Sequence, residues 1–240
     1  MDSTLAEFQE TTSQDAFALQ NHKLLKVSLN QVTIQAKLGS MVAYQGDVKF
    51  EHAGSGGMGK LLKKTLTGEG TKLMKMSGSG EVFLAVQAQD VHLLRIDNDE
   101  LNCNGANLLA FDAGIDWDIK RVEGASGMMS GGLFNVTLKG TGQIAVVSDG
   151  PPVLLQTSGT ATFADPQAAI VWSSGVKTSV KTDIGFKTLT GRGSGESVQM
   201  AFSGDGWVLV QPSEGRIETH ISDSNKGGGG LSGILSGLGN

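Results

Sequence analysis

Residues 77–86 read SGSGEVFLAV, two spaced glycines followed at once by a run in which polar and apolar residues alternate. The same arrangement returns at 139–148 (KGTGQIAVVS) and at 202–211 (FSGDGWVLVQ). The second glycine falls at 80, 142 and 206, so the copies are 62 and 64 residues apart. Alternation with a period of two is typical of half-buried strands. We interpret each Gly-x-Gly as a turn that leads into a strand, and we predict a repeated β unit.

A second landmark occurs in the same order, as a glycine followed a few residues later by an alanine beside an aromatic residue. It is present in LGSMVAYQGDVKFE (38–51), NGANLLAFDAGIDWDIK (104–120) and SGTATFADPQAAIVWSS (158–174). The two landmarks together predict three repeats, at about 24–86, 87–148 and 149–221. A unit of a few short strands cannot bury its apolar face alone, so we expect the three units to pack around a common axis.

The composition agrees with an all-β chain of one domain. Hydrophobic residues make up 39% of the 240 residues and charged residues 18%, which is enough to bury a core, and 35 glycines against 4 prolines favour tight turns. We predict a single all-β domain over 24–221. A polar lead-in over 1–23 is either an ordered strand or a loose arm, and 222–240 is a flexible Gly-rich tail. The only internal helix we expect is short and follows residue 58.

The charge and the N-terminal sequence narrow the compartment and the partners. A formal net charge of −5 gives no general attraction to phosphate backbones, so nucleic acid is disfavoured as a default partner. The single cysteine, Cys103, excludes an intramolecular disulfide and fits a reducing compartment. The first residues lack a secretory or organellar leader, and no apolar run approaches the length of a membrane helix. We expect a cytoplasmic protein without a transmembrane segment, and nothing in the sequence supports peripheral membrane contact.

The octapeptide GSGGMGKL (54–61) matches a phosphate-binding loop at every defined position except the last. Leu61 stands where a hydroxyl residue would bind Mg²⁺, and no alternation of strands and long helices surrounds it. We therefore expect a Gly-rich loop that binds no nucleotide. Five lysines cluster in and after this loop, and they form a candidate interaction patch that suits an acidic partner, anionic lipid or RNA. The patch residues are Lys60, Lys63, Lys64, Lys72 and Lys75.

Candidate chemical groups elsewhere in the sequence are sparse. Asp112, Asp116 and Asp118 either share a cation or are hydrated separately, and the sequence leaves both readings open. The four histidines lack the spacing of paired metal ligands. Ser194, in GRGSGES (191–197), has no identifiable base. We predict no catalytic residue, no cofactor and no assigned metal site.

In order and spacing, these motifs resemble the altered inheritance of mitochondria protein 24 family, formerly domain of unknown function 124. The resemblance covers nearly all of 24–212. It is carried by GSMVAYQGDVKFE (39–51), GSGGMGKLLKKTLTGEG (54–70), GSGEVFLA (78–85), NLLAFDAGIDWDI (107–119), the glycines and phenylalanine of 131–134 with KGTGQIAVVS after them, and FSGDGWVLVQP (202–212).

This resemblance implies an all-β fold of pseudo-threefold character, a β-sandwich or double-stranded β-helix-like domain of the class compared with the tryptophan RNA-binding attenuation protein. The eukaryotic namesake is linked to mitochondrial inner-membrane organisation, whereas bacterial relatives look cytosolic. The chain lacks a transit peptide and so resembles a bacterial-type member. No activity, cofactor or catalytic residue is firmly assigned across the family.

Our leading hypothesis is a non-enzymatic scaffold or interaction protein that forms homo-oligomers or binds a protein partner, because exposed edge strands invite pairing. One alternative is an RNA- or anion-binding module that uses the Lys60–Lys75 segment. A second alternative, a metal- or small-ligand-binding enzyme, predicts an ion or ligand bound to the purified protein.

Overall fold

The protein folds almost entirely into strands. The structure, a computed structural model, describes residues 3–52, 72–121, 134–182 and 198–214. Within them one short 3-10 helix, η1 (Ser3–Phe8), precedes fifteen strands. The strands are β1 (Phe17–Asn21), β2 (Leu24–Asn30), β3 (Ile34–Lys37), β4 (Met41–His52), β5 (Leu73–Leu84), β6 (Asp90–Asn104), β7 (Leu108–Asp112), β8 (Asp116–Arg121), β9 (Phe134–Ser148), β10 (Val153–Gln156), β11 (Thr162–Ala164), β12 (Ala169–Ser173), β13 (Lys177–Thr182), β14 (Val198–Ser203) and β15 (Trp207–Val210). The prediction of an all-β chain is confirmed.

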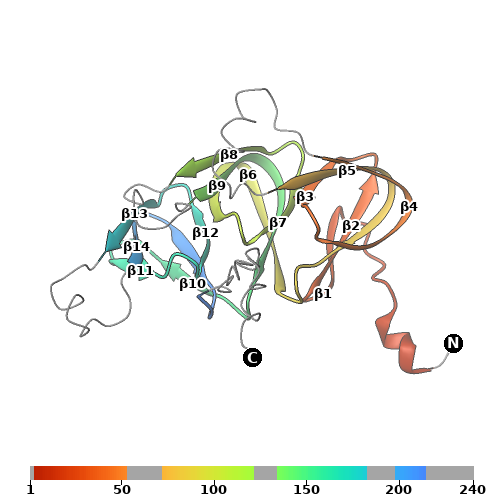
Figure 1. The fold of residues 1–240 in the computed structure, drawn as a ribbon, viewed down its shortest axis with the longest axis horizontal. Helices are drawn as coiled ribbons and strands as arrows, with labels where there is room; N and C mark the ends of the chain where they lie inside the picture. The colour runs from red at the N-terminus through yellow and green to blue at the C-terminus, as the bar shows by residue number, and fades with distance from the viewer. Residues whose placement is uncertain (1–2, 53–71, 122–133, 183–197, 215–240) are drawn as a thin grey trace, which may run out of the picture.

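Antiparallel pairing joins these strands into one large and one small sheet. The large sheet has twelve strands. Ten of them follow the order β1-β2-β5-β3-β7-β9-β6-β12-β15-β10, and the other two lie off this order, β4 beside β5 and β8 beside β9. The small sheet has the order β11-β14-β13. In Figure 1 the strands β1–β5, β6–β9 and β10–β14 follow one another along the long axis of the molecule in chain order. The first group therefore forms one end of the molecule.

Three antiparallel hairpins recur along the chain, formed by β4 with β5, β8 with β9 and β13 with β14. A glycine stands two residues before the first strand of each hairpin, at Gly39, Gly114 and Gly175. The second strand of the first two hairpins, β5 and β9, contains a Gly-x-Gly copy. The second strand of the third hairpin, β14, ends immediately before one. The hairpin thus occurs three times in the described chain, whereas a repeated unit of about 60 residues and the packing of three units around a common axis remain predictions.

The expectation that Gly-x-Gly forms a turn was wrong for the first two copies. Gly78 and Gly80 lie inside β5, and the second pair lies inside β9, while the third pair lies between β14 and β15. A Cβ atom on Gly80 would lie 2.3 Å from the carbonyl oxygen of Gln45 on β4. The glycine is therefore needed because a neighbouring backbone approaches closely, a role that gives the same sequence signal as a turn.

The second sequence landmark does not mark equivalent strands. Its alanine and aromatic residue fall on β4 at Ala43 and Tyr44, on β7 at Ala110 and Phe111, and on β11 at Phe163. These strands have different neighbours, because β4 pairs with β5, β7 with β3 and β9, and β11 with β14. A short alanine–aromatic pattern fits many half-buried strands, so its recurrence was misleading.

Three buried apolar clusters follow one another along the chain. The first gathers residues mainly from β1, β2, β3 and β5, the second mainly from β6, β7 and β9, and the third from β12, β14 and β15. In β2 the residues Leu25, Val27 and Leu29 are buried in the first cluster. The intervening Lys26 points away from that core, as strand alternation requires.

The lead-in contributes a strand to the large sheet. Phe17 is 2% exposed, and β1 pairs with β2 from Phe17 to Asn21, so the ordered-strand alternative holds for this part. The short helix expected after residue 58 and the tail over 222–240 lie outside the described residues. Among the helices that the structure describes, none is long and apolar enough to cross a membrane.

Candidate functional site

The strand β4 forms a long exposed edge. Eleven of its twelve residues are exposed. Among the described strands it pairs only with β5, along nearly its whole length, so its second edge is left without a partner there. A strand in this position presents N–H and C=O groups that are free to pair with another chain. Figure 1 shows β4 at the outer end of the first strand group.

One face of β4 carries apolar side chains into solvent. Val42, Tyr44 and Phe50 are 58%, 51% and 37% exposed. The rings of Tyr44 and Phe50 meet edge to face with centroids 5.2 Å apart, an arrangement that aromatic pairs favour. Val48, between them on the same face, is half-buried against the first core cluster. This face of β4 therefore lies at the margin of the first core cluster, and its outer apolar side chains remain exposed to solvent.

The opposite face of β4 is polar and alternates in charge. Gln45, Asp47, Lys49 and Glu51 follow one another at every second position. Gln45 Nε2 donates a hydrogen bond of 3.0 Å to Glu81 Oε2 on β5. Asp47, Lys49 and Glu51 make no ion pair with the part of the chain that the structure describes. These three charges are available to a partner.

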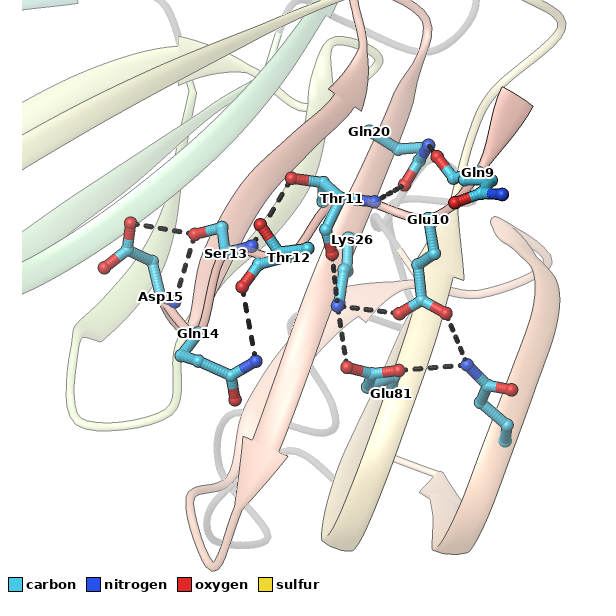
Figure 2. A network of polar contacts seen from close by, with 11 residues as sticks. Gln9, Glu10, Thr11, Thr12, Ser13, Gln14, Asp15, Gln20, Lys26 and Glu81 are labelled. Carbon is cyan, nitrogen blue, oxygen red and sulfur yellow. Dashed lines mark hydrogen bonds and ion pairs between the residues drawn. The ribbon is translucent and has the colours of Figure 1, made fainter. Parts of the chain in front are cut away.

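A buried lysine fastens the N-terminal segment beside this edge (Figure 2). The side chain of Lys26 is 2% exposed, and its Nζ lies 2.7 Å from Oε1 of Glu10 and 2.7 Å from Oε1 of Glu81. It also donates to the carbonyl oxygen of Thr11 at 3.0 Å. Gln45 Nε2 donates to Glu10 Oε2 at 2.7 Å, so a β4 residue closes the network.

The network sets the ionisation of its members. Burial acts most strongly on Lys26 and lowers its pKa, but the hydrogen bonds and charges of Glu10 and Glu81 together outweigh burial, and the pKa lies above the ordinary 10.5. The hydrogen bond from Lys26 is the main cause that lowers the pKa of Glu81 from 4.5 to about 2. Lys26 and Glu81 are therefore both charged at neutral pH, and the ion pair from Lys26 to Glu10 holds the N-terminal segment against this pair.

Sequence reasoning missed this network. The run LLKVSLN shows a lysine on the outer face of a strand, which normally means a solvated side chain. Its partners lie 16 residues before and 55 residues after it in the sequence, and no local spacing links them. We assign this network a structural role, because it joins the N-terminal segment at Glu10 to β2, to β5 and to Gln45 of β4.

The predicted lysine patch falls mostly outside the described residues. Lys60, Lys63 and Lys64 belong to the undescribed stretch, whereas Lys72 is exposed next to β5 and Lys75 is half-buried within it. Lys75 pairs with Gln35 on one side and with Glu51 on the other in the strand register. The structure therefore does not test the patch as a whole, and the binding of RNA or another anion to it remains a prediction.

The three aspartates considered for a cation make separate backbone contacts. Asp112 Oδ2 accepts a 2.7 Å hydrogen bond from the backbone N–H of Gln143. Asp116 and Asp118 each accept from the N–H of the next residue. No group of three or more His, Cys, Asp or Glu residues that could hold a metal ion occurs within the described ranges. The three carboxylates are therefore not gathered into one group in the described structure, and cation binding by them remains untested.

The remaining titratable groups are dispersed. His92 Nε2 lies 2.7 Å from Ser148 Oγ. Burial lowers the pKa of His92, and the nearby charge of Asp90 offsets only part of that shift. His22 Nε2 lies 3.9 Å from Asp90 Oδ1. Cys103 is fully buried, which raises its thiol pKa to about 12 and makes it unreactive. Ser148 Oγ donates to the carbonyl oxygen of Gly150 at 2.6 Å and the residue is fully buried, so His92 donates to this hydroxyl and does not act as a base for an exposed nucleophile.

A pocket of about 430 Å³ lies on the small sheet formed by β11, β13 and β14. Hydroxyl groups and backbone line much of it, and Lys181 Nζ lies 4.7 Å from the ring centroid of Phe163. Its lining contains no carboxylate, imidazole or thiol. Lys181 is the charged side chain of this lining, and the hydroxyl groups of serines and threonines surround it.

The fold and the site define an all-β protein with a long exposed edge strand and, within the described residues, no group of side chains that could hold a metal ion. The chain belongs to the Mitochondrial biogenesis AIM24 family, whose family model matches residues 17–213. The match begins at the first residue of β1 and covers most of the chain, and it confirms the resemblance seen in the sequence.

A solved structure supports the same fold. The X-ray crystal structure of a protein from Streptococcus pyogenes matches with a TM-score of 0.66 and 22% sequence identity, over 82% of this chain and 92% of the other. No curated protein matches the sequence.

Proposed function

We propose that the protein is a non-enzymatic interaction protein that assembles with further copies of itself through exposed strand edges. The observation that carries this proposal is β4, a twelve-residue strand with one unpaired edge in the described structure and apolar side chains on one face. Native proteins usually block such edges with proline, short length or cover. β4 contains no proline and is long.

The far end of the sheet supports the same reading. β10 closes the strand order, and Val153 and Leu154 on it are 53% and 52% exposed. The molecule therefore presents exposed apolar residues on β10, at one end of the strand order, and on β4, which lies off that order beside β5. Three repeated units would place such edges at regular intervals, which is the arrangement we propose for the scaffold. The cytoplasm is the compartment we propose for it, and the free Cys103 thiol is compatible with that.

Light scattering on the full chain tests the proposal. We expect a concentration-dependent mass above that of the 25.0 kDa monomer. Replacing both Tyr44 and Phe50 by threonine should weaken the association, because it removes apolar contact area while keeping residues that favour strands. Phe50→Thr and Phe163→Thr form a matched pair, because each removes one phenylalanine ring from a partly exposed position, on β4 and on β11. Only the change on β4 should lower the mass. A wild-type chain that stays monomeric at every concentration would contradict the proposal.

A further inference from the structure

We propose that the partner of β4 is β4 of a second copy, paired antiparallel about a twofold axis at Val48, so that two sheets become one. This inference rests on the self-association proposed above and specifies its surface and register. Antiparallel pairing of a strand with itself is isologous, since each residue pair occurs twice. With the axis at Val48, the paired stretch runs from Tyr44 to His52.

The two faces of β4 restrict the possible registers. Tyr44, Val48 and Phe50 share the apolar face, while Asp47 and Lys49 share the polar face. Residues directly opposite each other in an antiparallel pair point to the same side of the sheet. A slip by one residue would therefore set the apolar face of one copy against the charged face of the other. Only registers with the axis on a residue keep like faces together.

Charge and the length of the paired stretch then select among those registers. An axis at Phe50 would set Lys49 opposite Glu51, but because β4 ends at His52 it would pair only residues 48–52. An axis at Val48 places Asp47 of each copy opposite Lys49 of the other, which gives two opposite-charge pairs. Moving the axis to Asp47 sets Asp47 opposite its own copy, and moving it to Lys49 sets two lysines opposite each other. Like charges directly opposite are destabilising. Because Asp47 and Lys49 make no ion pair within the described chain, both remain available for this contact.

The apolar face fits the same register. Val48 meets Val48 of the second copy on the axis, and Phe50 lies opposite Gly46. Gly46 has a φ of +95° and lies so close to the backbone of Ser79 and Gly80 that it carries no side chain, so Phe50 of the second copy would lie opposite backbone alone. An aromatic residue opposite a glycine in a neighbouring strand covers the exposed backbone there. The pairing would thus cover the Tyr44–Phe50 ring pair, which is the uncovered rim of the first core cluster.

Lys49 sharpens the choice of partner. A lysine on an edge strand ordinarily discourages edge-to-edge pairing, because it would be buried beside a foreign backbone. Asp47 removes this obstacle for one partner, a second β4 in the register described, because Asp47 of that copy lies opposite Lys49 and neutralises its charge. The same residue would then oppose pairing with strands that lack a matching carboxylate.

Complementary charge reversals test the pairing with the full chain. Asp47→Lys gives a strand with lysine at both positions, and Lys49→Asp gives one with aspartate at both. Each variant alone should associate at least about tenfold more weakly than wild type, because two attractive pairs become repulsive. An equal mixture of the two variants should form the mixed dimer with near wild-type affinity, detected by native mass spectrometry. The double variant Asp47→Lys/Lys49→Asp should also associate.

A matched control and the melting curve separate this test from loss of folding. Glu51→Lys makes the same change in charge on the same face but lies opposite Gln45 in the proposed register, so it should associate as wild type does. Unchanged thermal unfolding would show that the variants are folded. A wild-type chain that does not associate overturns the proposed function itself. Association that is insensitive to both reversals, or a mixture that does not recover, overturns the β4 register and leaves self-association standing.

Discussion

At the scale of single residues, Lys26 shows how a charged side chain becomes part of the fold. It lies on the outer face of β2, opposite Leu25 and Val27, and the segment around Glu10 closes over it. Burying one charge is costly, but two carboxylates and a carbonyl oxygen satisfy all three ammonium hydrogens. Removing one partner is therefore more harmful than exchanging the whole set.

Lys26→Met should destabilise the protein by about 2 kcal/mol, below the usual range for a broken buried pair, because Glu10 and Glu81 keep 36% and 27% exposure. Urea unfolding measures the change. Lys23→Met is the matched control: Lys23 is 44% exposed and pairs with Asp90 at 3.0 Å, so its loss should cost less than about 1 kcal/mol. Equal losses for both variants would contradict the role given to Lys26. Adding Glu10→Gln and Glu81→Gln to Lys26→Met should recover part of the loss.

The same network predicts a pH dependence. The pKa of Glu81 is lowered from 4.5 to about 2, so the charged form is favoured in the folded state. Its contribution is fully present above pH 4.5 and is lost as the pH falls towards 2, with a total on the order of 3 kcal/mol. The raised pKa of Lys26 has the opposite sign: its contribution is present below pH 10.5 and is lost as the pH rises further.

Glu81→Gln isolates the acid limb of this dependence. The variant should be less stable than wild type at neutral pH and should lose less further stability between pH 4.5 and 2, when urea midpoints are compared across that range. A stability curve parallel to that of wild type over the same interval would show that Glu81 does not titrate with the lowered pKa.

At the scale of elements, the β4–β5 hairpin depends on glycines within the returning strand. A Cβ atom on Gly80 would meet the carbonyl oxygen of Gln45 at 2.3 Å and the Cα atom of Gly46 at 3.1 Å. Both contacts are with backbone, which cannot move aside as a flexible side chain can. The close approach positions the whole of β4 and hence the exposed edge.

Gly80→Ala should therefore destabilise the protein by roughly 2 kcal/mol, as overpacking against backbone does. Gly114→Ala is the control, because a Cβ atom there has no neighbour within 4 Å and the residue does not have a positive φ. That change should be neutral or slightly stabilising. Thermal unfolding of both variants measures the difference. If Gly80→Ala matched Gly114→Ala, the hairpin would not depend on this contact.

The sequence supports the strands better than the role of the glycines. The runs after Gly80, Gly142 and Gly206 lie in β5, β9 and β15, so period-two alternation found real strands. The sequence predicts turns at the glycines themselves. The prediction fails because the lack of a side chain suits a turn and a close approach of two strands equally well. Only the position of β4 across β5 distinguishes the two, and a single sequence does not contain that information.

At the scale of the whole molecule, the family and the all-β class could be predicted from the order and spacing of motifs, and both are confirmed. The candidate site could not. The lysine patch is visible in the sequence because its like charges are close together there. The β4 edge is defined by the absence of a second neighbouring strand in the described sheet, which the sequence does not show. Burial and pairing are properties of the folded chain, and GSMVAYQGDVKFE has the pattern of an ordinary half-buried strand.

The mass of the full chain in solution tests the central claim most directly. If the exposed edges assemble copies of the protein, native mass spectrometry and light scattering should both find oligomers built from pairs of the 25.0 kDa chain, dissociating to smaller species on dilution. A single 25.0 kDa species at all concentrations would contradict self-association and with it the function proposed for the β4 edge.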